Sequence, residues 1–167
     1  MTPTEQAELT AYVAARSPAL LRTAYLLVGD RAEAEDLLQE ALARLAVAWR
    51  RVREQESLDG YVRRTMINLR TSRWRRRRVP TVLVDVLPER GGPHPQADVA
   101  ERDAMWSGLA TLPPRMRAVL VLRFYEDLTE VDAARALGCS VGTVKSQTSR
   151  ALAKLRATLP AIQELPC

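Results

Sequence analysis

A cluster of carboxylates in the first quarter of the chain could bind a metal ion or act in catalysis. The stretch from Asp30 to Glu40 holds five acids against one arginine. Four of these acids, Glu33, Glu35, Asp36 and Glu40, could hold a divalent metal ion for phosphodiester hydrolysis. Carboxylates this dense on a helix are more often a charged surface, and no catalytic partner for them is evident. We therefore predict no catalytic residue and no metal site, and keep a nuclease as the least favoured alternative.

Cysteine and histidine are too scarce for a disulfide framework or a zinc cluster. The sequence contains only Cys139, Cys167 and His94, so neither kind of site can be assembled. The N-terminus carries Glu5 and Glu8 and lacks the apolar core of a signal peptide. Its apolar runs are also too short to span a bilayer. We expect a cytoplasmic protein without a cofactor and without membrane insertion.

The composition favours an all-α protein. The 167 residues fit one ordinary domain or two small ones, and 47% of them are hydrophobic, so a core is feasible. Aromatic residues make up only 5%, which leaves a core of mostly Leu, Val and Ala. Ala and Leu favour helices, and runs with the two-residue period of a strand are scarce.

Charge is distributed unevenly along the chain. The net charge is +5 and the isoelectric point is about 9.8, an excess that would suit nucleic acid, an acidic protein or a membrane surface. Residues 62–78 include eight arginines and no acid, in contrast to the acidic stretch 30–40. A basic face and an acidic face predict two kinds of partner.

Prolines and a Gly pair in "VPTVLVDVLPERGGPHPQAD" mark a boundary between two helical units, because both residue types interrupt helices. We predict a first domain at residues 1–78, a flexible linker at 79–98, a second domain at 99–160 and a tail at 161–167. The short "TVLVDVL" within the linker has no visible partner strand. We expect it to be an extended segment lying on a surface.

Three helices are predicted in the first unit. The first runs from Thr4 to about Val28 and is interrupted or restarted near Ser17-Pro18. Asp30 caps the second helix, whose apolar residues recur at spacings of three and four and form a buried stripe. The stripe comprises Ala34, Leu37, Leu38, Ala41, Leu42, Leu45, Ala48, Trp49 and Val52. The third helix extends from about Asp59 to Arg78.

The second unit is predicted to end in a helix-turn-helix. A helix from about Val99 stops at "LPP", and Pro114 starts the next helix, "RMRAVLVLRFYE". A short helix, "TEVDAARAL", is capped by Thr129 or Asp127. A turn at Gly138 and a cap at Ser140 then precede a longer polar helix at residues 141–158.

The long polar helix has the residues of a DNA-reading surface. Short hydroxyls and long cations at its start could reach base edges and phosphates in the major groove. The predicted outward residues are Thr143, Lys145, Ser146, Ser149 and Arg150, and the predicted core residues are Val141, Val144, Ala151, Leu152 and Leu155. The same pattern also arises by chance in Ala-rich helical proteins.

Three stretches, in order, resemble one family over nearly the whole chain. They are "GDRAEAEDLLQEALARL", "YVRRTMINLRTSRWRRRR" and "LPPRMRAVLVLRFYEDLTEVDAARALGCSVGTVKSQTSRALAKLR". These look like signatures of bacterial extracytoplasmic-function (ECF) sigma factors of the sigma-70 family, most of all the actinobacterial sigma-E-type group. The resemblance implies a region 2 domain and a region 4 domain joined by a flexible linker.

The resemblance implies a docking face and a minus-ten face in the first unit. Four residues match positions that bind the clamp of the largest polymerase subunit: Asp36, Leu37, Gln39 and Glu40. The acids alone could be a solvated helix face.

Residues 52–60 match the base-reading loop, and Asn68 matches a position near the flipped base. Tyr61 stands where Trp is frequent in the family. The predicted minus-ten residues are Tyr61, Arg63, Arg64, Asn68, Arg70, Arg73, Trp74, Arg75 and Arg76; Trp74 could equally belong to the core.

In the second unit the resemblance assigns the outward residues named above to the minus-thirty-five element. Arg115, Arg117 and Arg123 could add phosphate contacts or be surface charge. The implied function is an alternative sigma factor, with the clamp and flap of core RNA polymerase, promoter DNA and an anti-sigma factor as partners. The main alternative is a free-standing helix-turn-helix regulator, which would leave the acidic and Arg-rich helices without a role.

Overall fold

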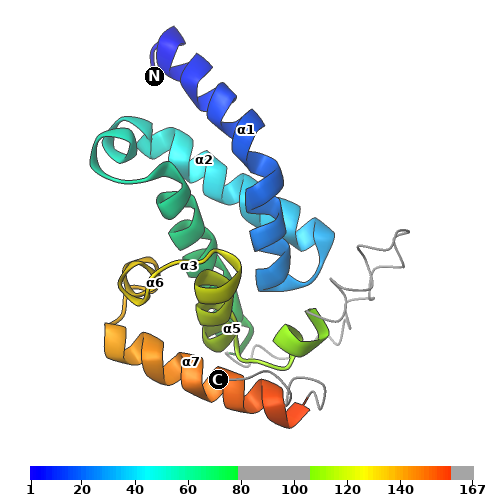
Figure 1. The fold of residues 1–167 in the computed structure, drawn as a ribbon. Helices are drawn as coiled ribbons and strands as arrows, with labels where there is room; N and C mark the ends of the chain where they lie inside the picture. The colour runs from blue at the N-terminus through cyan, green and yellow to red at the C-terminus, as the bar shows by residue number, and fades with distance from the viewer. Residues whose placement is uncertain (79–105, 159–167) are drawn as a thin grey trace.

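The protein is all-helical over the residues that its computed structural model describes, 1–78 and 106–158, with side chains described for 1–73 and 106–158. In chain order, the elements are α1 (Pro3–Val28), α2 (Arg31–Gln55), α3 (Leu58–Arg78), α5 (Pro114–Leu120), the π-helical turn η1 (Val121–Tyr125), α6 (Glu130–Leu137) and α7 (Val141–Thr158). Residues 106–110 are also helical. Figure 1 shows the arrangement. The all-α prediction is confirmed for this part of the chain. The predicted linker, its extended segment and the tail lie outside the described residues.

Helix α1 is continuous, so the predicted interruption near Ser17-Pro18 is wrong. Pro18 lies inside the helix and removes one backbone donor. Side chains on both sides of Pro18 keep the helix attached to the core: Tyr12 packs partly buried before it, and Leu20 is fully buried after it. The Ser17 hydroxyl donates to the Val13 carbonyl at 2.6 Å within the same turn. Tertiary packing therefore outweighs the local cost of proline.

The predicted cap and apolar stripe of α2 are confirmed. The Asp30 carboxylate accepts a hydrogen bond from the backbone N–H of Glu33 at 2.8 Å, which satisfies one of the free donors at the helix start. Every residue of the stripe is buried or packed against the core. The stripe meets α1 and α3, where Leu45, Val62 and Met66 are fully buried.

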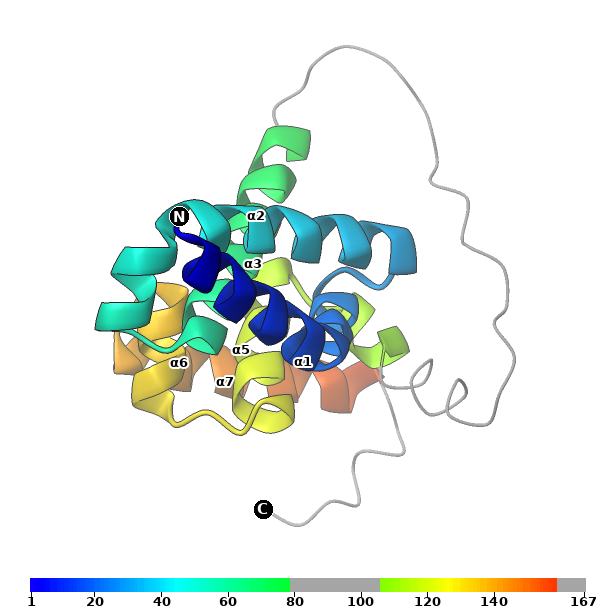
Figure 2. The same cartoon turned by 90° about the horizontal axis from the view of Figure 1, so that it is seen from above.

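Helix α3 belongs to both halves of the molecule. Its apolar side packs on α2 and α1, and it also contacts α5 and α6 of the second half. Figures 1 and 2 show α3 between the first two helices and the group formed by α5, α6 and α7. Helix α1 contributes as well, through contacts with η1 and α5. The two halves are therefore packed together along α1 and α3.

Within the described residues, no helix combines the length and apolar character that crossing a membrane requires.

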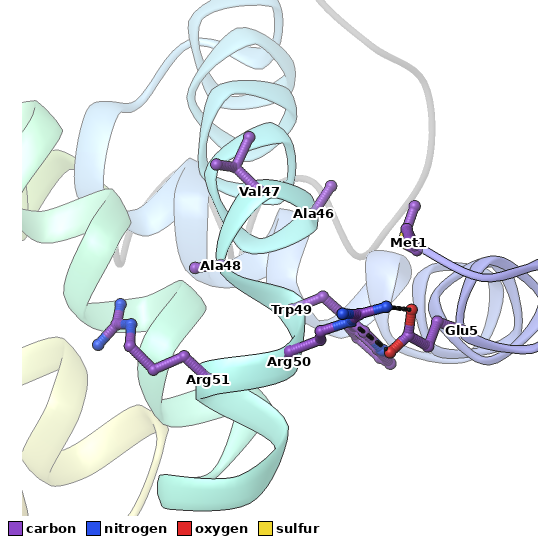
Figure 3. A pocket seen from close by; sticks show the side chains of 8 residues that line it. All are labelled: Met1, Glu5, Ala46, Val47, Ala48, Trp49, Arg50 and Arg51. Atoms are coloured by element: carbon purple, nitrogen blue, oxygen red, sulfur yellow. Dashed lines mark hydrogen bonds and ion pairs between the residues drawn. The ribbon is translucent and has the colours of Figure 1, made fainter.

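An acidic residue ties the start of α1 to α2. Glu5 completes a capping box with Thr2, and its carboxylate accepts hydrogen bonds from Arg50 at 2.8 and 3.2 Å. Figure 3 shows this pair at the rim of a hollow of about 270 Å³. The hydrogen bond from Arg50, followed by that from the Thr2 backbone, lowers the pKa of Glu5 to about 2 from its ordinary 4.5.

Glu5 should make the folded state sensitive to acid. Because its pKa is lower in the folded than in the unfolded chain, the stabilisation is present above about pH 4.5 and is lost as the pH falls toward 2. We expect Glu5→Gln to lower the free energy of unfolding at pH 7 and to flatten its fall between pH 4.5 and 2. Urea unfolding across this range measures both effects. Glu8→Gln removes a more exposed pair with Arg53 and should change the profile less; equal profiles for the two variants would contradict the assignment to Glu5.

Candidate nucleic-acid interface

The predicted docking face on α2 is only partly open. Asp36 and Gln39 are exposed, whereas Glu40 accepts from Arg44 at 2.8 Å and from Arg73 at 2.7 Å. Leu37 is fully buried in the core, so its prediction as a contact residue needs correction. Its place on the apolar stripe turns it inward, where it supports the exposed residues from beneath.

Three arginines of α3 are paired with carboxylates: Arg63, Arg64 and Arg73. Arg64 pairs with Glu56 at 2.7 Å, and Arg73 pairs with Glu40. The hydrogen bond from Arg73 is the main reason why the pKa of Glu40 is lowered, and the bond from Arg64 has the same effect on the pKa of Glu56. These acids are therefore held as anions near the cations that were predicted to bind DNA.

Arg63 lies in the most enclosed of these pairs. Its side chain is 15% exposed and pairs with Glu126 from the second half through Nη2, which also lies 3.7 Å from Asp59. Asp59 also accepts from Tyr12 at 2.8 Å and from Arg16. Burial alone would raise the pKa of Asp59, but the hydrogen bonds from Arg16 and Tyr12 and the nearby positive charges lower it.

Tyr61 and Asn68 carry side chains that could contact a nucleic-acid base, by stacking or by hydrogen bonding. The Tyr61 ring has the Arg64 guanidinium 5.5 Å from its centre and that of Arg51 at 6.0 Å, an arrangement that suits stacking on nucleic acid. Asn68 is exposed and lines a hollow of about 160 Å³ beside α5 and α6. The Arg70 side chain is half-buried. The side chains predicted at Trp74, Arg75 and Arg76 lie outside the described residues.

The helix-turn-helix forms as its turn residues predict. Thr129 caps α6 by accepting from the backbone of Asp132 at 3.1 Å, and Gly138 ends this helix with φ of +63°, a conformation that favours glycine. Ser140 then accepts from the backbone of Thr143 at 3.1 Å and caps α7. The turn therefore fixes how α7 is presented.

The two faces of α7 are divided as predicted. Val144 and Ala151 are fully buried, Leu155 is buried, and Val141 and Leu152 pack partly buried against the core. Lys145, Ser146, Ser149 and Arg150 are exposed, and Thr143 is half-buried. Lys145 lies 3.6 Å from Glu130 of α6. These five residues, the exposed row of α7, place hydroxyl groups and cations on one accessible surface. Contact with base edges in a DNA groove requires such groups.

Arg117 is not the phosphate-binding or surface residue that the sequence left open. It is 6% exposed and donates to the backbone carbonyls of Leu109 and Leu27, both at 2.9 Å. Two further carbonyls, of Leu112 and Ala110, accept from it at 3.2 and 3.4 Å. Burial, followed by the charge of Arg70, lowers its pKa to about 10. Arg123 also turns inward and donates to the Leu128 carbonyl, whereas Arg115 is exposed.

Sequence reasoning missed the contacts between the halves. Trp106 lies outside the three family-like stretches, and Glu126 lies within the third, but their partners in the first half lie far away in the sequence. The Thr23 hydroxyl donates to Glu126, and the Trp106 ring stacks at a tilt on Tyr25, with ring centres 6.3 Å apart. Gly29 was a sequence signal for one of these contacts, because glycine is favoured where another part of the chain, here Trp106, lies against the backbone.

The four acids named for the nuclease alternative do not converge on one site in the described part of the chain. In residues 1–73 and 106–158, no three His, Cys, Asp or Glu side chains are grouped so that they could hold a metal ion. Of the four acids, Glu35 pairs with Arg31 at 2.9 Å and Glu40 pairs with arginines. Asp36 is exposed, so three of the four acids are surface or ion-pairing groups.

Comparison with known families matches both halves of the chain. Residues 12–79 match sigma-70 region 2, and residues 108–157 match sigma-70 region 4. The chain is 43% identical to the RNA polymerase sigma-E factor of Streptomyces coelicolor over 94% of its own length and 89% of that protein. It is 42% identical to the factor of the same name from Streptomyces avermitilis, over 93% and 87%.

Solved structures share the fold. The sigma factor RpoE of Bartonella quintana, solved with the anti-sigma factor NepR, matches with a TM-score of 0.70 at 23% identity, over 92% of this chain and 97% of that one. CnrH, solved with the cytosolic domain of CnrY, matches with a TM-score of 0.69 at 23% identity, over 93% and 90%.

The packing of α7 can be tested separately from its reading surface. Val144→Ala removes two methyl groups from a fully buried site and should lower the free energy of unfolding by about 2 kcal/mol. The control Ser146→Ala changes an exposed hydroxyl on the same turn and should stay within about 0.5 kcal/mol. Chemical denaturation followed by circular dichroism measures both. A Val144→Ala variant as stable as the control would contradict the packing described for α7.

Proposed function

The chain belongs to the sigma-70 family of RNA polymerase sigma factors, in its extracytoplasmic-function group, and we propose that it joins core polymerase and reads two promoter elements without chemistry of its own. The observation that carries the proposal is the match of the first half to region 2 and the second half to region 4 in one chain. Each half presents a surface suited to its part: the α2 face with the α3 arginines, and the exposed row of α7. A cytoplasmic location follows from this role.

In the proposed mechanism, α2 holds the polymerase and two readers hold the promoter. Asp36 and Gln39 bind the clamp together with Glu40, while the region 4 half meets the flap. The exposed residues of α7 read the minus-thirty-five element as duplex. Tyr61, Asn68 and the α3 arginines bind the melted minus-ten strand. Two weak readers on one chain raise each other's effective concentration, so neither needs to bind DNA tightly alone.

An anti-sigma factor is a further proposed partner. Two solved proteins that share this fold, the sigma factor RpoE and CnrH, each have another protein bound. In the RpoE structure that protein is an anti-sigma factor. A regulator that covers the docking face or the α3 arginines would block the proposed assembly. The free-standing regulator is not favoured, because it would leave the region 2 half without a role.

The docking face is tested by binding to core polymerase. Asp36→Arg reverses an exposed charge and Gln39→Ala removes an exposed amide, and each should weaken retention of the chain on immobilised core enzyme, the reversal by about tenfold or more. The control Glu54→Arg reverses an exposed charge elsewhere on α2 and should bind normally. Unchanged retention of both face variants would refute the α2 docking face.

The minus-thirty-five reader is tested by specificity. Arg150→Ala and Lys145→Ala should each weaken recognition by about 1–3 kcal/mol if they contact bases. Arg156→Ala, an exposed cation at the other end of α7, serves as the control. Transcription from promoters changed only in that element measures the effect, and the two variants should lose discrimination between templates. Equal losses on every template would indicate phosphate contacts alone.

A further inference from the structure

The two cations in the exposed row of α7 differ in how firmly they are held. Lys145 lies near the start of the helix, and its ammonium nitrogen is 3.6 Å from a carboxylate oxygen of Glu130. Arg150 lies further along and is exposed, and its side chain has no hydrogen-bond or ion-pair partner within residues 1–73 and 106–158. One cation of the reading surface is therefore tethered, whereas the other is free.

The tether joins the two helices of the helix-turn-helix. Glu130 is the first residue of α6, a position where the helix dipole favours a negative charge. Gly138 ends α6 and the Ser140 cap begins α7, so the turn fixes where the two side chains meet. Both side chains are open to water, 39% exposed for Glu130 and 64% for Lys145. The pair therefore lies within reach of DNA bound along α7.

The separation of the pair attracts the ammonium without occupying its donors. At 3.6 Å it exceeds the length of a hydrogen bond, so the three N–H groups of Lys145 remain available for acceptors. A guanine presents two acceptors in the major groove, O6 and N7, and a lysine can bind both. Lys145 can therefore contact a guanine edge while its charge stays beside Glu130.

The neighbouring Ser146 has the opposite hydrogen-bonding role. Its hydroxyl donates to the Thr143 carbonyl at 3.1 Å, so only acceptor lone pairs remain for DNA. The donors that a major groove offers to them are the amino groups of cytosine and adenine. Successive residues of α7 thus present donors and then an acceptor. This order is kept only if Lys145 stays on the side of the bases, because its long stem can also reach a phosphate.

From this geometry we propose that Glu130 determines specificity: it holds the Lys145 ammonium toward base edges and disfavours its capture by a phosphate. The inference rests on the proposed reading of the minus-thirty-five element by α7. A lysine on a flexible stem binds phosphates of any sequence, and a carboxylate beside it repels those phosphates. Glu130 therefore lowers the affinity that is independent of sequence and preserves discrimination between bases. Because it acts through Lys145, Glu130 is a positioning residue.

The test uses the full chain assembled with core polymerase. The probe is a pool of barcoded duplex promoter templates in which only the upstream element is randomised, and sequencing of the transcripts gives the preference at each base pair. Lys145→Ala should remove the preference at the base pair that Lys145 contacts. Glu130→Gln should weaken the preference at that same base pair by about threefold, as expected for losing an exposed ion pair, and should leave the other base pairs unchanged.

The salt dependence of promoter binding is a second readout. In Glu130→Gln the released Lys145 gains a phosphate contact, so the slope of log K against log salt concentration should steepen by about 0.9. In a chain that already carries Lys145→Ala, adding Glu130→Gln should change no base preference. Such a double-mutant cycle separates an effect exerted through Lys145 from an effect on the fold of the motif.

Asp132→Asn is the matched control. It also removes an exposed negative charge from α6, but Asp132 pairs with Thr129 and Arg135 at the start of that helix. It should keep the base preferences and the salt slope of the original chain. Glu130→Asp retains the charge beside Lys145 and should keep most of the preference that Glu130→Gln loses.

The outcomes distinguish this inference from the function on which it rests. If Glu130→Gln and Asp132→Asn show the same base preferences, or if Lys145→Ala changes none, the inference is overturned and the proposed function stands. A loss spread over every base pair, or one that persists beside Lys145→Ala, would also overturn it. If the original chain starts transcription from no template, the proposed function fails and the inference fails with it.

Discussion

A buried guanidinium holds the two halves of this molecule together. Arg117 lies out of water, and a cation in that position is tolerated only when its donors find acceptors. Its acceptors are four backbone carbonyls, one at the end of α1 and three just before α5. Separating the halves would remove the Leu27 carbonyl from this set and expose the guanidinium to water. The relative placement of α1 and α5 thus depends on a buried polar contact.

The ion pairs of α3 differ in what opening would do to them. Glu56 and Glu40, the partners of Arg64 and Arg73, belong to the first half and stay beside α3 in any arrangement of the halves. Glu126, the partner of Arg63, comes from the second half and leaves when the halves separate. Strand capture in the proposed mechanism is therefore an exchange of partners, with carboxylates replaced by phosphates. Such an exchange costs less than exposing an unpaired buried charge, because each guanidinium remains hydrogen-bonded throughout.

The sequence predicted those features that neighbouring residues determine. The α2 stripe follows from spacings of three and four, and the caps at Asp30, Thr129 and Ser140 follow from side chains that can accept from the next turn. Pro18 was misjudged because its local cost is offset by packing on both sides. The contacts of Arg117 with Leu27 and of Glu126 with Thr23 and Arg63 were missed for a related reason. They join residues about 60 to 100 positions apart, and no periodicity encodes such pairs. Leu37 was predicted to contact the polymerase because it lies within the family motif, although its place in the apolar stripe of α2 already predicted burial.

Glu40 connects the two proposed partners of the first half. It lies on the face assigned to the polymerase clamp, yet it also accepts from Arg73 of the strand-binding helix. A clamp group that binds Glu40 would compete with Arg73 and release that cation for DNA. By linkage, DNA bound at Arg73 would in turn free Glu40 for the clamp, so the two events would favour each other by the same free energy. Asp36 and Gln39 remain exposed while the halves are closed. In the proposed assembly the polymerase can therefore engage α2 without any rearrangement of the two halves.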